Sequence, residues 1–196
     1  MEKRFIGSQE LLEDSFRLAV KIYESGFRPD YIVGIWRGGT PVGIVVHDFL
    51  AYVGVKANHI SVRTSYKGME FYDPKGPKQQ TRVHNTRFLI DRVNAGDSLL
   101  IVDDVYSSGR SVEAVIKRLK RKLRRNMASD VRIAVPFYKP SHNRTGRVPD
   151  YVLHESDEWL VMPHELNGLT VDEIKEHRPV VDELARKALG ADMAAS

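Results

Sequence analysis

A short apolar segment that runs into two acidic residues and a hydroxyl-rich turn constrains the fold more than any other feature of the sequence. Residues 98–102 read Ser-Leu-Leu-Ile-Val, and Asp103 and Asp104 follow directly. A continuous apolar run of this length before a polar turn is typical of a strand buried on both faces. The turn, residues 103–110, contains Gly109 and precedes a helical pattern over residues 111–125. We therefore expect a strand, a turn and a helix in direct succession.

Other parts of the chain repeat this alternation. Residues 31–35 are apolar and lead through Arg37-Gly38-Gly39-Thr40-Pro41 into a second apolar segment, residues 42–53, which we expect to be a buried helix. Residues 131–138 and 151–154 are further predicted strands.

Residues 8–26 are a predicted helix that ends at Gly26, and its expected packing face is Leu12, Phe16, Ala19 and Tyr23. The inner face of the helix at 111–125 is expected at Val112, Ile116, Leu119 and Leu123. Alternating strands and helices predict an α/β fold, a single domain with a parallel sheet flanked by helices on both faces.

Composition excludes several classes of protein. The 196 residues suit one domain, and an apolar content of 42% is enough to form a core. No apolar run reaches the roughly 20 residues needed to cross a bilayer, so we expect a cytoplasmic protein with no membrane partner. Cysteine is absent, which excludes disulfides and thiolate chemistry. The net charge of +4 does not require a nucleic-acid partner.

Two segments depart from the alternation. Residues 63–85 are polar, contain glycine and proline, and have no sustained period, so we expect a long mobile loop. Residues 180–196 form a tail in which an amphipathic helix is expected through Leu184 and Leu189. We expect a main domain over residues 1–179 and a separate helical tail over residues 180–196.

The turn after the apolar strand has the composition of a phosphate site. Backbone N–H groups at the start of the helix, together with the hydroxyls of Ser107, Ser108 and Ser111, would surround a phosphate, which the helix dipole also favours. Gly109 would allow the backbone to approach the ligand closely. Asp103 and Asp104 would hold a different part of the ligand, because carboxylates accept hydrogen bonds from ribose hydroxyls and bind Mg²⁺. The alternative is that the acids end a strand and Ser111 caps a helix.

Residues 99–111 resemble the signature with which type I phosphoribosyltransferases bind phosphoribosyl pyrophosphate (PRPP). The resemblance extends over residues 31–166 and implies a parallel sheet with a mobile lid, residues 63–86, and a base-binding hood, residues 139–170. It implies that Asp103, Asp104 and Arg37 have catalytic roles and that the two acids bind the metal. The implied PRPP-binding residues are Arg37, Gly38, Asp103, Asp104, Tyr106, Ser107, Ser108, Gly109, Arg110 and Ser111.

Arg37-Gly38-Gly39 is similar to the pyrophosphate loop of this family. An arginine suits a departing diphosphate because it is always charged and donates two parallel hydrogen bonds. The resemblance also implies a cis peptide bond between Trp36 and Arg37. Viewed without the resemblance, the segment is equally well explained as a glycine turn between a strand and a helix.

The polar loop is similar to the lid of these enzymes, and Ser65-Tyr66 to a pair that closes over the reacting centre. A closed lid would exclude water from a reactive ribosyl cation. Positive side chains in the loop would add charge near pyrophosphate, although each alone is equally typical of a solvated loop: Lys67, Lys75, Lys78 and Arg82.

The base pocket resembles that of bacterial and archaeal xanthine-guanine phosphoribosyltransferases, some of which also use hypoxanthine. In this comparison Lys139 would donate to a 6-oxo group and Trp159 would stack on the purine. The Leu160 backbone would contact the ring edge, and Glu165 would accept from an amine or a ring N–H. Without the PRPP signature, the tryptophan would be assigned to the core and the lysine to the surface.

Ser107 departs from the pattern of the hypoxanthine and guanine enzymes, which usually have aspartate there to exchange a proton with the purine. A serine hydroxyl cannot act as a base near neutral pH without a partner. Adenine and orotate enzymes and RNA-binding regulators of pyrimidine operons also lack this aspartate. The basic segment at 117–125 would suit a regulator but is also typical of a solvated helix face.

The sequence therefore predicts a Mg²⁺-dependent purine salvage enzyme of the hypoxanthine, guanine or xanthine type. It would join the base to the ribose 5-phosphate of PRPP and release pyrophosphate and a nucleoside monophosphate. The alternatives are a PRPP-binding or RNA-binding regulator and an enzyme for another nucleobase. The resemblance also implies a homo-oligomer, a dimer or tetramer, and we expect no nucleic-acid partner.

Overall fold

The computed structural model describes residues 3–66 and 81–194, whose contacts form two compact units. The large unit is Ser8–Glu158, and the small unit combines Met1–Gly7 with Trp159–Ser196. The small unit combines two segments distant in sequence because β1 (Lys3–Phe5) pairs in parallel with β9 (Trp159–Val161). The expected division into a main domain over residues 1–179 and a tail over residues 180–196 stays a prediction.

The large unit is built on a seven-stranded sheet in the order β4-β3-β2-β5-β7-β6, and β8 also pairs with β7. All pairs are parallel except β3 with β4, so the predicted α/β fold with a mostly parallel sheet is confirmed. The strands are β2 (Tyr31–Trp36), β3 (Asn58–Tyr66), β4 (Thr81–His84), β5 (Ser98–Val102), β6 (Val105–Tyr106), β7 (Asp130–Tyr138) and β8 (Tyr151–Glu155).

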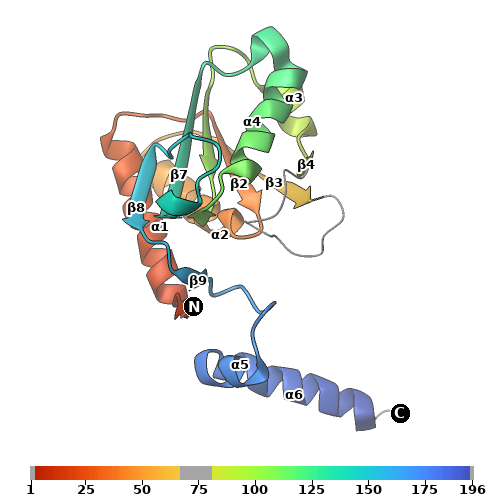
Figure 1. Ribbon diagram of the computed structural model, residues 1–196. Coiled ribbons are helices and arrows are strands. Elements are labelled where there is room, and N and C mark those ends of the chain that lie inside the picture. Colours follow the sequence, from red (N-terminus) through yellow and green to blue (C-terminus); the bar gives the residue numbers. More distant parts are fainter. Residues whose placement is uncertain (1–2, 67–80, 195–196) are drawn as a thin grey trace. The chain divides into compact units, whose positions relative to one another are not determined.

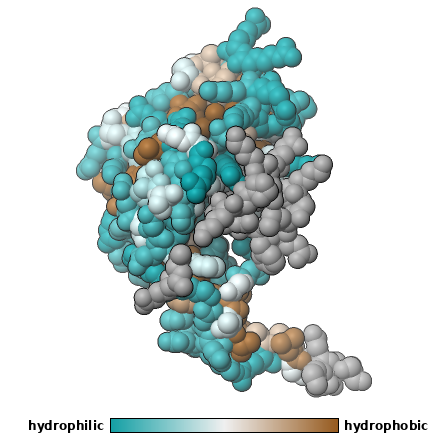
Figure 2. Space-filling model, in the orientation of Figure 1, coloured by the Kyte–Doolittle hydropathy of each residue, from teal (hydrophilic) through white to brown (hydrophobic). Residues whose placement is uncertain are grey.

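Helices cover both faces of this sheet (Figure 1). On one face, α1 (Ser8–Glu24) and α2 (Gly39–Tyr52) pack against each other and against the strands. On the other, α4 (Arg110–Leu123) packs with the short α3 (Arg87–Arg92) and against β3 and β4. Two single-turn 3₁₀ segments, Arg124–Asn126 and Pro140–His142, follow α4 and β7. The face of the large unit seen in Figure 2 is mostly hydrophilic, as expected when the apolar side chains lie between the layers.

The core beneath α4 follows the alternation of the strands. Val33 and Ile35 of β2 and Leu99 and Ile101 of β5 belong to one buried cluster with α4. The predicted inner face of α4 is confirmed, because all four residues of the stripe are buried: Val112, Ile116, Leu119 and Leu123. Adjacent parallel strands put like-facing residues side by side, so a few β-branched and leucine side chains form a continuous layer.

The packing face of α1 agrees with the prediction only in part, since Ala19 is buried as expected. Leu12 and Phe16 are 41% and 42% exposed, whereas Leu11, Leu18 and Ile22 are buried together with Asp14 and Ser15. The buried polar groups are satisfied, since Asp14 accepts from Arg17 at 2.7 Å and meets His154 at 2.7 Å. The Ser15 hydroxyl donates to the Leu11 carbonyl at 2.7 Å. A pattern that counts only apolar residues misses a face that buries polar residues with partners.

The expected loop at 63–85 is wrong at both flanks. β3 continues to Tyr66, and β4 begins at Thr81 and returns antiparallel to β3, with Arg63 opposite His84. Polar side chains on this edge pair conceal the strands from a reading based on apolar alternation. Residues 67–80, which carry the predicted lysines of the lid, lie outside the described residues.

The small unit contains two helices after β9. The first, α5 (Val171–His177), begins with a capping box between Thr170 and Glu173, and Glu173 also forms an ion pair with Lys3 at 2.7 Å. The second, α6 (Pro179–Ala194), confirms the helix predicted in the tail. Three of its apolar side chains are exposed: Val180, Leu184 and Leu189. None of the helices in the described part of the chain is long and apolar enough to cross a membrane.

Two leucine-to-alanine changes in α1 test the corrected packing face. Leu18→Ala removes a fully buried side chain and should lower the free energy of unfolding by about 2–5 kcal/mol. Leu12→Ala should cost about 1 kcal/mol or less, because that side chain is partly exposed. Urea unfolding followed by circular dichroism measures the free energy of unfolding of both variants. Equal losses in the two would contradict the finding that Leu18 is buried and Leu12 is partly exposed.

Candidate functional site

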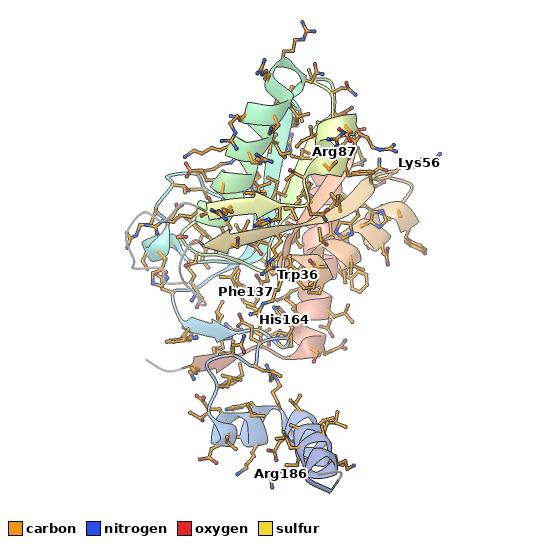
Figure 3. The ribbon with its side chains drawn as sticks, turned by 90° about the vertical axis from the view of Figure 1, so that its right-hand side faces the viewer. Trp36, Lys56, Arg87, Phe137, His164 and Arg186 are labelled. Atoms are coloured by element: carbon orange, nitrogen blue, oxygen red, sulfur yellow. The ribbon has the colours of Figure 1, made fainter. Side chains whose placement is uncertain are left out.

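The predicted ligand segments meet at one end of the sheet. β2 and β5 are neighbouring parallel strands, with Gly34 opposite Val102, so Arg37 and Asp103 both lie just beyond the carboxyl ends of their strands. Figure 3 shows Trp36 and Phe137 at this end of the sheet, and Lys56 and Arg87 toward the other end. Open parallel sheets bind their ligands beyond the carboxyl ends of the strands. This edge is therefore the candidate site.

The glycine loop lies directly against the two acids. A Cβ atom at Gly38 would overlap the Asp104 carboxylate, and one at Gly39 would lie 2.8 Å from the Asp103 Cα. A side chain at Gly38 would displace the Asp104 carboxylate, and at Gly39 glycine is required by the close approach of two backbones. The Trp36–Arg37 peptide bond is cis, which confirms the form implied by the resemblance.

Asp103 and Asp104 form a compact acidic pair. The Asp104 N–H donates to Asp103 Oδ1 at 3.1 Å, and the Val105 N–H donates to Asp104 Oδ1 at 2.8 Å. Burial raises the pKa of Asp103 well above its ordinary value, and the nearby charge of Asp104 raises it further. Desolvated, mutually repelling carboxylates of this kind are typical of sites that receive a cation or hydroxyl donors.

The donor set fits Mg²⁺ that is bound partly by its substrate. Among the residues that the structure describes, no three metal-binding side chains converge. Mg²⁺ commonly uses one or two carboxylates and completes its shell with water and substrate phosphates. Two adjacent carboxylates beside a glycine loop match this pattern.

The turn after the acids has the geometry of an anion site. Gly109 has φ 74°, in the left-handed region, and precedes the first residue of α4. A Cβ at Gly109 would overlap the Tyr106 hydroxyl and lie 2.6 Å from Thr145 Oγ1, so the position has no room for a side chain. Ser108 is buried, and its Oγ accepts from the Arg110 N–H at 3.4 Å. The start of a 14-residue helix therefore directs N–H groups at the same edge as Asp103.

Tyr106 is engaged within the protein. Its side chain is 2% exposed, and its hydroxyl donates to the Arg147 carbonyl at 2.9 Å and meets Thr145 Oγ1 at 3.0 Å. The tyrosine therefore connects the turn at residues 107–111, called the phosphate turn below because it is predicted to bind a phosphate, to residues 145–147. Its side chain supports the turn, and the assignment of Tyr106 to PRPP binding stays a prediction.

The segment after β7 is held against this turn by two backbone hydrogen bonds. The Lys139 N–H donates to the Tyr106 carbonyl at 2.9 Å, and the Arg144 N–H donates to the Ser108 carbonyl at 3.1 Å. Between these bonds, His142 Nδ1 lies 3.4 Å from Ser107 Oγ. Sequence reasoning missed His142, although its position three residues after Lys139, beyond a predicted strand, marks it as part of the same edge.

The predicted base-binding residues are divided between the two units. In the large unit, Lys139 is buried and its Nζ donates to the Glu158 carbonyl. In the small unit, Trp159 is 52% exposed and lies 5.6 Å from Lys3 Nζ, measured to the ring centroid. Leu160 lies in β9 opposite Arg4, and Glu165 Oε2 accepts from the Met162 N–H at 3.1 Å.

The predicted lid pair lies at the end of β3. Ser65 Oγ meets His84 Nε2 of β4 at 3.0 Å, and the Tyr66 backbone pairs with Thr81. Arg82 stands opposite Ser65, whereas Lys67, Lys75 and Lys78 lie outside the described residues. At the base of this hairpin, the Thr64 hydroxyl donates to Ser111 Oγ at 3.5 Å, which connects the lid strands to the phosphate turn.

Solved structures with a similar fold include several phosphoribosyltransferases. A purine phosphoribosyltransferase from Pyrococcus horikoshii is 23% identical with a TM-score of 0.64, over 87% of this chain and 98% of that one. A xanthine-guanine-hypoxanthine phosphoribosyltransferase from Helicobacter pylori is 19% identical with a TM-score of 0.61, over 90% and 100%. A hypothetical protein from Neisseria gonorrhoeae with bound ppGpp is 21% identical with a TM-score of 0.68, over 94% and 98%. These likenesses establish the fold.

Comparison of the sequence itself identifies the family. No curated protein matches the chain. A family model for the phosphoribosyl transferase domain matches residues 7–167, which include the glycine loop, the acidic pair and the phosphate turn. The chain therefore belongs to the phosphoribosyl transferase domain family, as its resemblance to the type I enzymes implied, and is an enzyme of the phosphoribosyltransferase class.

Proposed function

We propose that this protein transfers the ribose 5-phosphate of PRPP to a 6-oxopurine, releasing pyrophosphate. The observation that carries the proposal is the contact of Gly38 and Gly39 with Asp103 and Asp104, beside the phosphate turn at Gly109. PRPP carries a diphosphate, a diol and a 5-phosphate on one ribose ring, and each needs a different kind of partner. The three segments at this edge supply these partners: the glycine loop for the diphosphate, the acidic pair for the diol and the phosphate turn for the 5-phosphate.

The glycine loop suits the diphosphate. Arg37 follows the last residue of β2 and is exposed, and Gly38 carries no side chain that would hinder a phosphate oxygen. An arginine and backbone N–H groups stabilise negative charge that develops on a leaving group. In our proposal Arg37 holds pyrophosphate as it departs.

The acidic pair suits the ribose, and the turn suits the 5-phosphate. Asp103 and Asp104 would accept hydrogen bonds from the ribose hydroxyls and favour positive charge on the ring in the transition state. Bound Mg²⁺ would neutralise charge on the pyrophosphate oxygens. The N–H groups and hydroxyls of residues 107–111 would bind the phosphate, supported by Arg110 at the first helical position.

Substrate choice is assigned to the residues that resemble the xanthine-guanine enzymes. Lys139 would donate to the 6-oxo group, Trp159 would stack on the purine, and the Leu160 backbone and Glu165 would contact its edge. The exposed Trp159 ring supports this assignment, since a tryptophan of the core would be buried. A role in purine salvage follows from the reaction. The lid and homo-oligomeric assembly remain predictions of the resemblance, and a cytoplasmic location remains a prediction from the apolar pattern of the sequence.

A PRPP-binding regulator is a second candidate, favoured by the charge of α4. Basic residues concentrate at its C-terminal half and in the turn that follows: Lys117, Arg118, Lys120, Arg121, Lys122, Arg124 and Arg125. Of these, Lys117 pairs with Glu113 at 2.8 Å. A surface of this kind would attract a polyanion. The regulator requires PRPP binding without nucleotide formation, which separates it from the enzyme.

A substrate panel tests the proposed reaction. The protein is incubated with Mg²⁺, PRPP and each of hypoxanthine, guanine, xanthine, adenine, uracil and orotate, and nucleotides are separated by chromatography. We expect a monophosphate with at least one 6-oxopurine and loss of product when EDTA removes Mg²⁺. Product with none of the bases would contradict the enzyme, and product only with adenine, uracil or orotate would contradict the base assignment.

A pair of glycine-to-alanine changes tests the close approach. Gly38→Ala should reduce kcat/KM on the order of 100-fold, because the new methyl group displaces Asp104 from the ribose. Gly96→Ala is the matched control, since a Cβ there meets no atom within 4 Å, and its kinetics should equal those of the wild type. Equal activity of the two variants would remove Gly38 from the site.

The acidic pair predicts a dependence of stability on pH. Because the pKa of Asp103 is raised in the folded protein, the fold binds its proton more tightly than the unfolded chain does. Stability therefore falls as pH rises from the ordinary carboxyl pKa, about 3.9, through the raised pKa.

Asp103→Asn should remove this contribution, so that the variant is more stable than the wild type at pH 8 and nearly inactive. Urea midpoints measured from pH 5 to pH 8 in EDTA, with activity measured separately in Mg²⁺, test both parts. A variant that is less stable than the wild type at pH 8 would contradict the raised pKa.

A further inference from the structure

The chemistry proposed above leaves one proton without an acceptor. When a purine forms the glycosidic bond through N9, the other imidazole nitrogen, N7, must give up its proton if the ring is to stay neutral. Ser107 stands where related purine enzymes usually have aspartate, and a serine hydroxyl alone is not a base near neutral pH. The site therefore needs a second group in contact with Ser107.

The structure supplies such a group in His142. Its Nδ1 lies 3.4 Å from Ser107 Oγ, across 35 residues of sequence. The distance is long for a hydrogen bond, as is common for catalytic contacts before the substrate binds. Imidazole is the side chain most often used as a general base near neutral pH.

Backbone hydrogen bonds fix this contact on both sides. The Lys139 N–H donates to the Tyr106 carbonyl and the Arg144 N–H to the Ser108 carbonyl, so the carbonyls on either side of Ser107 are both held. The His142 N–H itself donates to the Lys139 carbonyl at 3.2 Å. His142 therefore lies on a tight turn that is hydrogen-bonded to the phosphate turn. Its distance from Ser107 is set by the fold.

We propose that Ser107 and His142 form a proton relay for the purine, which rests on the proposed function. As purine N9 bonds to the ribose anomeric carbon and pyrophosphate leaves with the bonding electrons, Ser107 Oγ accepts the N7 proton. The Ser107 hydroxyl passes its own proton to His142 Nδ1, which yields imidazolium and leaves the serine neutral. The relay requires the tautomer with the proton on Nε2.

Nε2 provides the exit for the proton. It forms no hydrogen bond with any residue that the structure describes, and the side chain is partly exposed. Imidazolium can therefore lose its Nε2 proton to water between turnovers, and further proton exchange with water restores the tautomer with the proton on Nε2 that the relay requires. The relay needs no co-reactant beyond solvent.

The charged groups near His142 leave its ring available. On its own segment, Lys139 Nζ is directed to the Glu158 carbonyl, and Arg144 is exposed. Asp157 accepts from the Ser141 N–H at 3.2 Å. On the facing turn, the Tyr106 hydroxyl is occupied by Thr145 and the Arg147 carbonyl. Ser107 is the described side chain that His142 meets.

Four variants test the relay through bypass and rescue. Ser107→Ala and His142→Ala should each lower kcat by about 100-fold or more, the usual contribution of acid–base catalysis, and His142→Ala should leave the Kd for PRPP unchanged. Ser107→Asp introduces a carboxylate that accepts the purine proton directly. The double variant Ser107→Asp/His142→Ala should therefore recover at least tenfold over His142→Ala. Ser141→Ala, on the same turn, is the control and should match the wild type.

The pH profile gives a second readout. The general base of a reaction determines where kcat/KM falls on the acidic side of the profile. In Ser107→Asp/His142→Ala this fall should move to lower pH, because a carboxylate ionises at lower pH than an imidazole. A role of His142 in holding the turn would produce neither the rescue nor the displaced profile.

The outcomes separate this proposal from the function on which it rests. If the wild type forms no purine nucleotide, the proposed function and the relay are both wrong. If the wild type is active and His142→Ala retains its kcat, or if the double variant Ser107→Asp/His142→Ala is no more active than His142→Ala, the relay alone is overturned. Circular dichroism of each variant identifies any change that unfolds the protein, and the rescue compares two chains that share the His142→Ala change.

Discussion

The close approach of the Gly38–Gly39 backbone to the Asp103–Asp104 pair is the contact on which the rest of the site depends. It exists because β2 and β5 are adjacent and parallel, so both segments emerge at the same edge. A diphosphate and a ribose diol are neighbours on one ligand but require opposite partners. In the proposed function, an arginine loop against a carboxylate pair would meet both needs within one small volume.

This arrangement works against the stability of the fold. Asp103 is held in a buried position next to a second carboxylate, and its raised pKa reflects the resulting cost of its charge. The surrounding strands are fully buried, with Leu99, Leu100, Ile101 and Val102 all without exposure, and they hold the pair in position. Sites that bind charged substrates often keep such unfavourable groups, and the rest of the core compensates.

The sequence predicted those parts of the fold that depend on continuous or periodic apolar patterns. β5 begins and ends at the expected residues, and α4 buries the expected stripe, because leucine, isoleucine and valine at these spacings have no other favourable arrangement. The face of α1 was predicted only in part: Ala19 is buried as expected, but Asp14 and Ser15 are also buried with partners. The Asp14 partner His154 is 140 residues away in sequence, so local pattern could not identify it. β3 and β4 were missed because an edge pair needs few apolar residues.

The segments proposed to bind PRPP, residues 37–39 and 103–111, could be predicted because their chemistry is local. Each combines its characteristic residues, an arginine with glycines or acids with hydroxyls, within a few positions. His142 could not be predicted, since its contact with Ser107 arises only when β6 pairs with β7 and the two following turns are joined. The predicted base-binding residues could be recognised from the sequence only in part. Lys139 and Trp159 are recognisable by resemblance, yet they belong to different units of the chain.

Hydrogen–deuterium exchange with and without PRPP and Mg²⁺ tests the central claim most directly. Amide protons at residues 37–39 and 104–111 should exchange more slowly when the ligand is present, because their N–H groups and the acidic pair bind it. Unchanged exchange in both segments, at PRPP concentrations that saturate binding measured by calorimetry, would contradict the account.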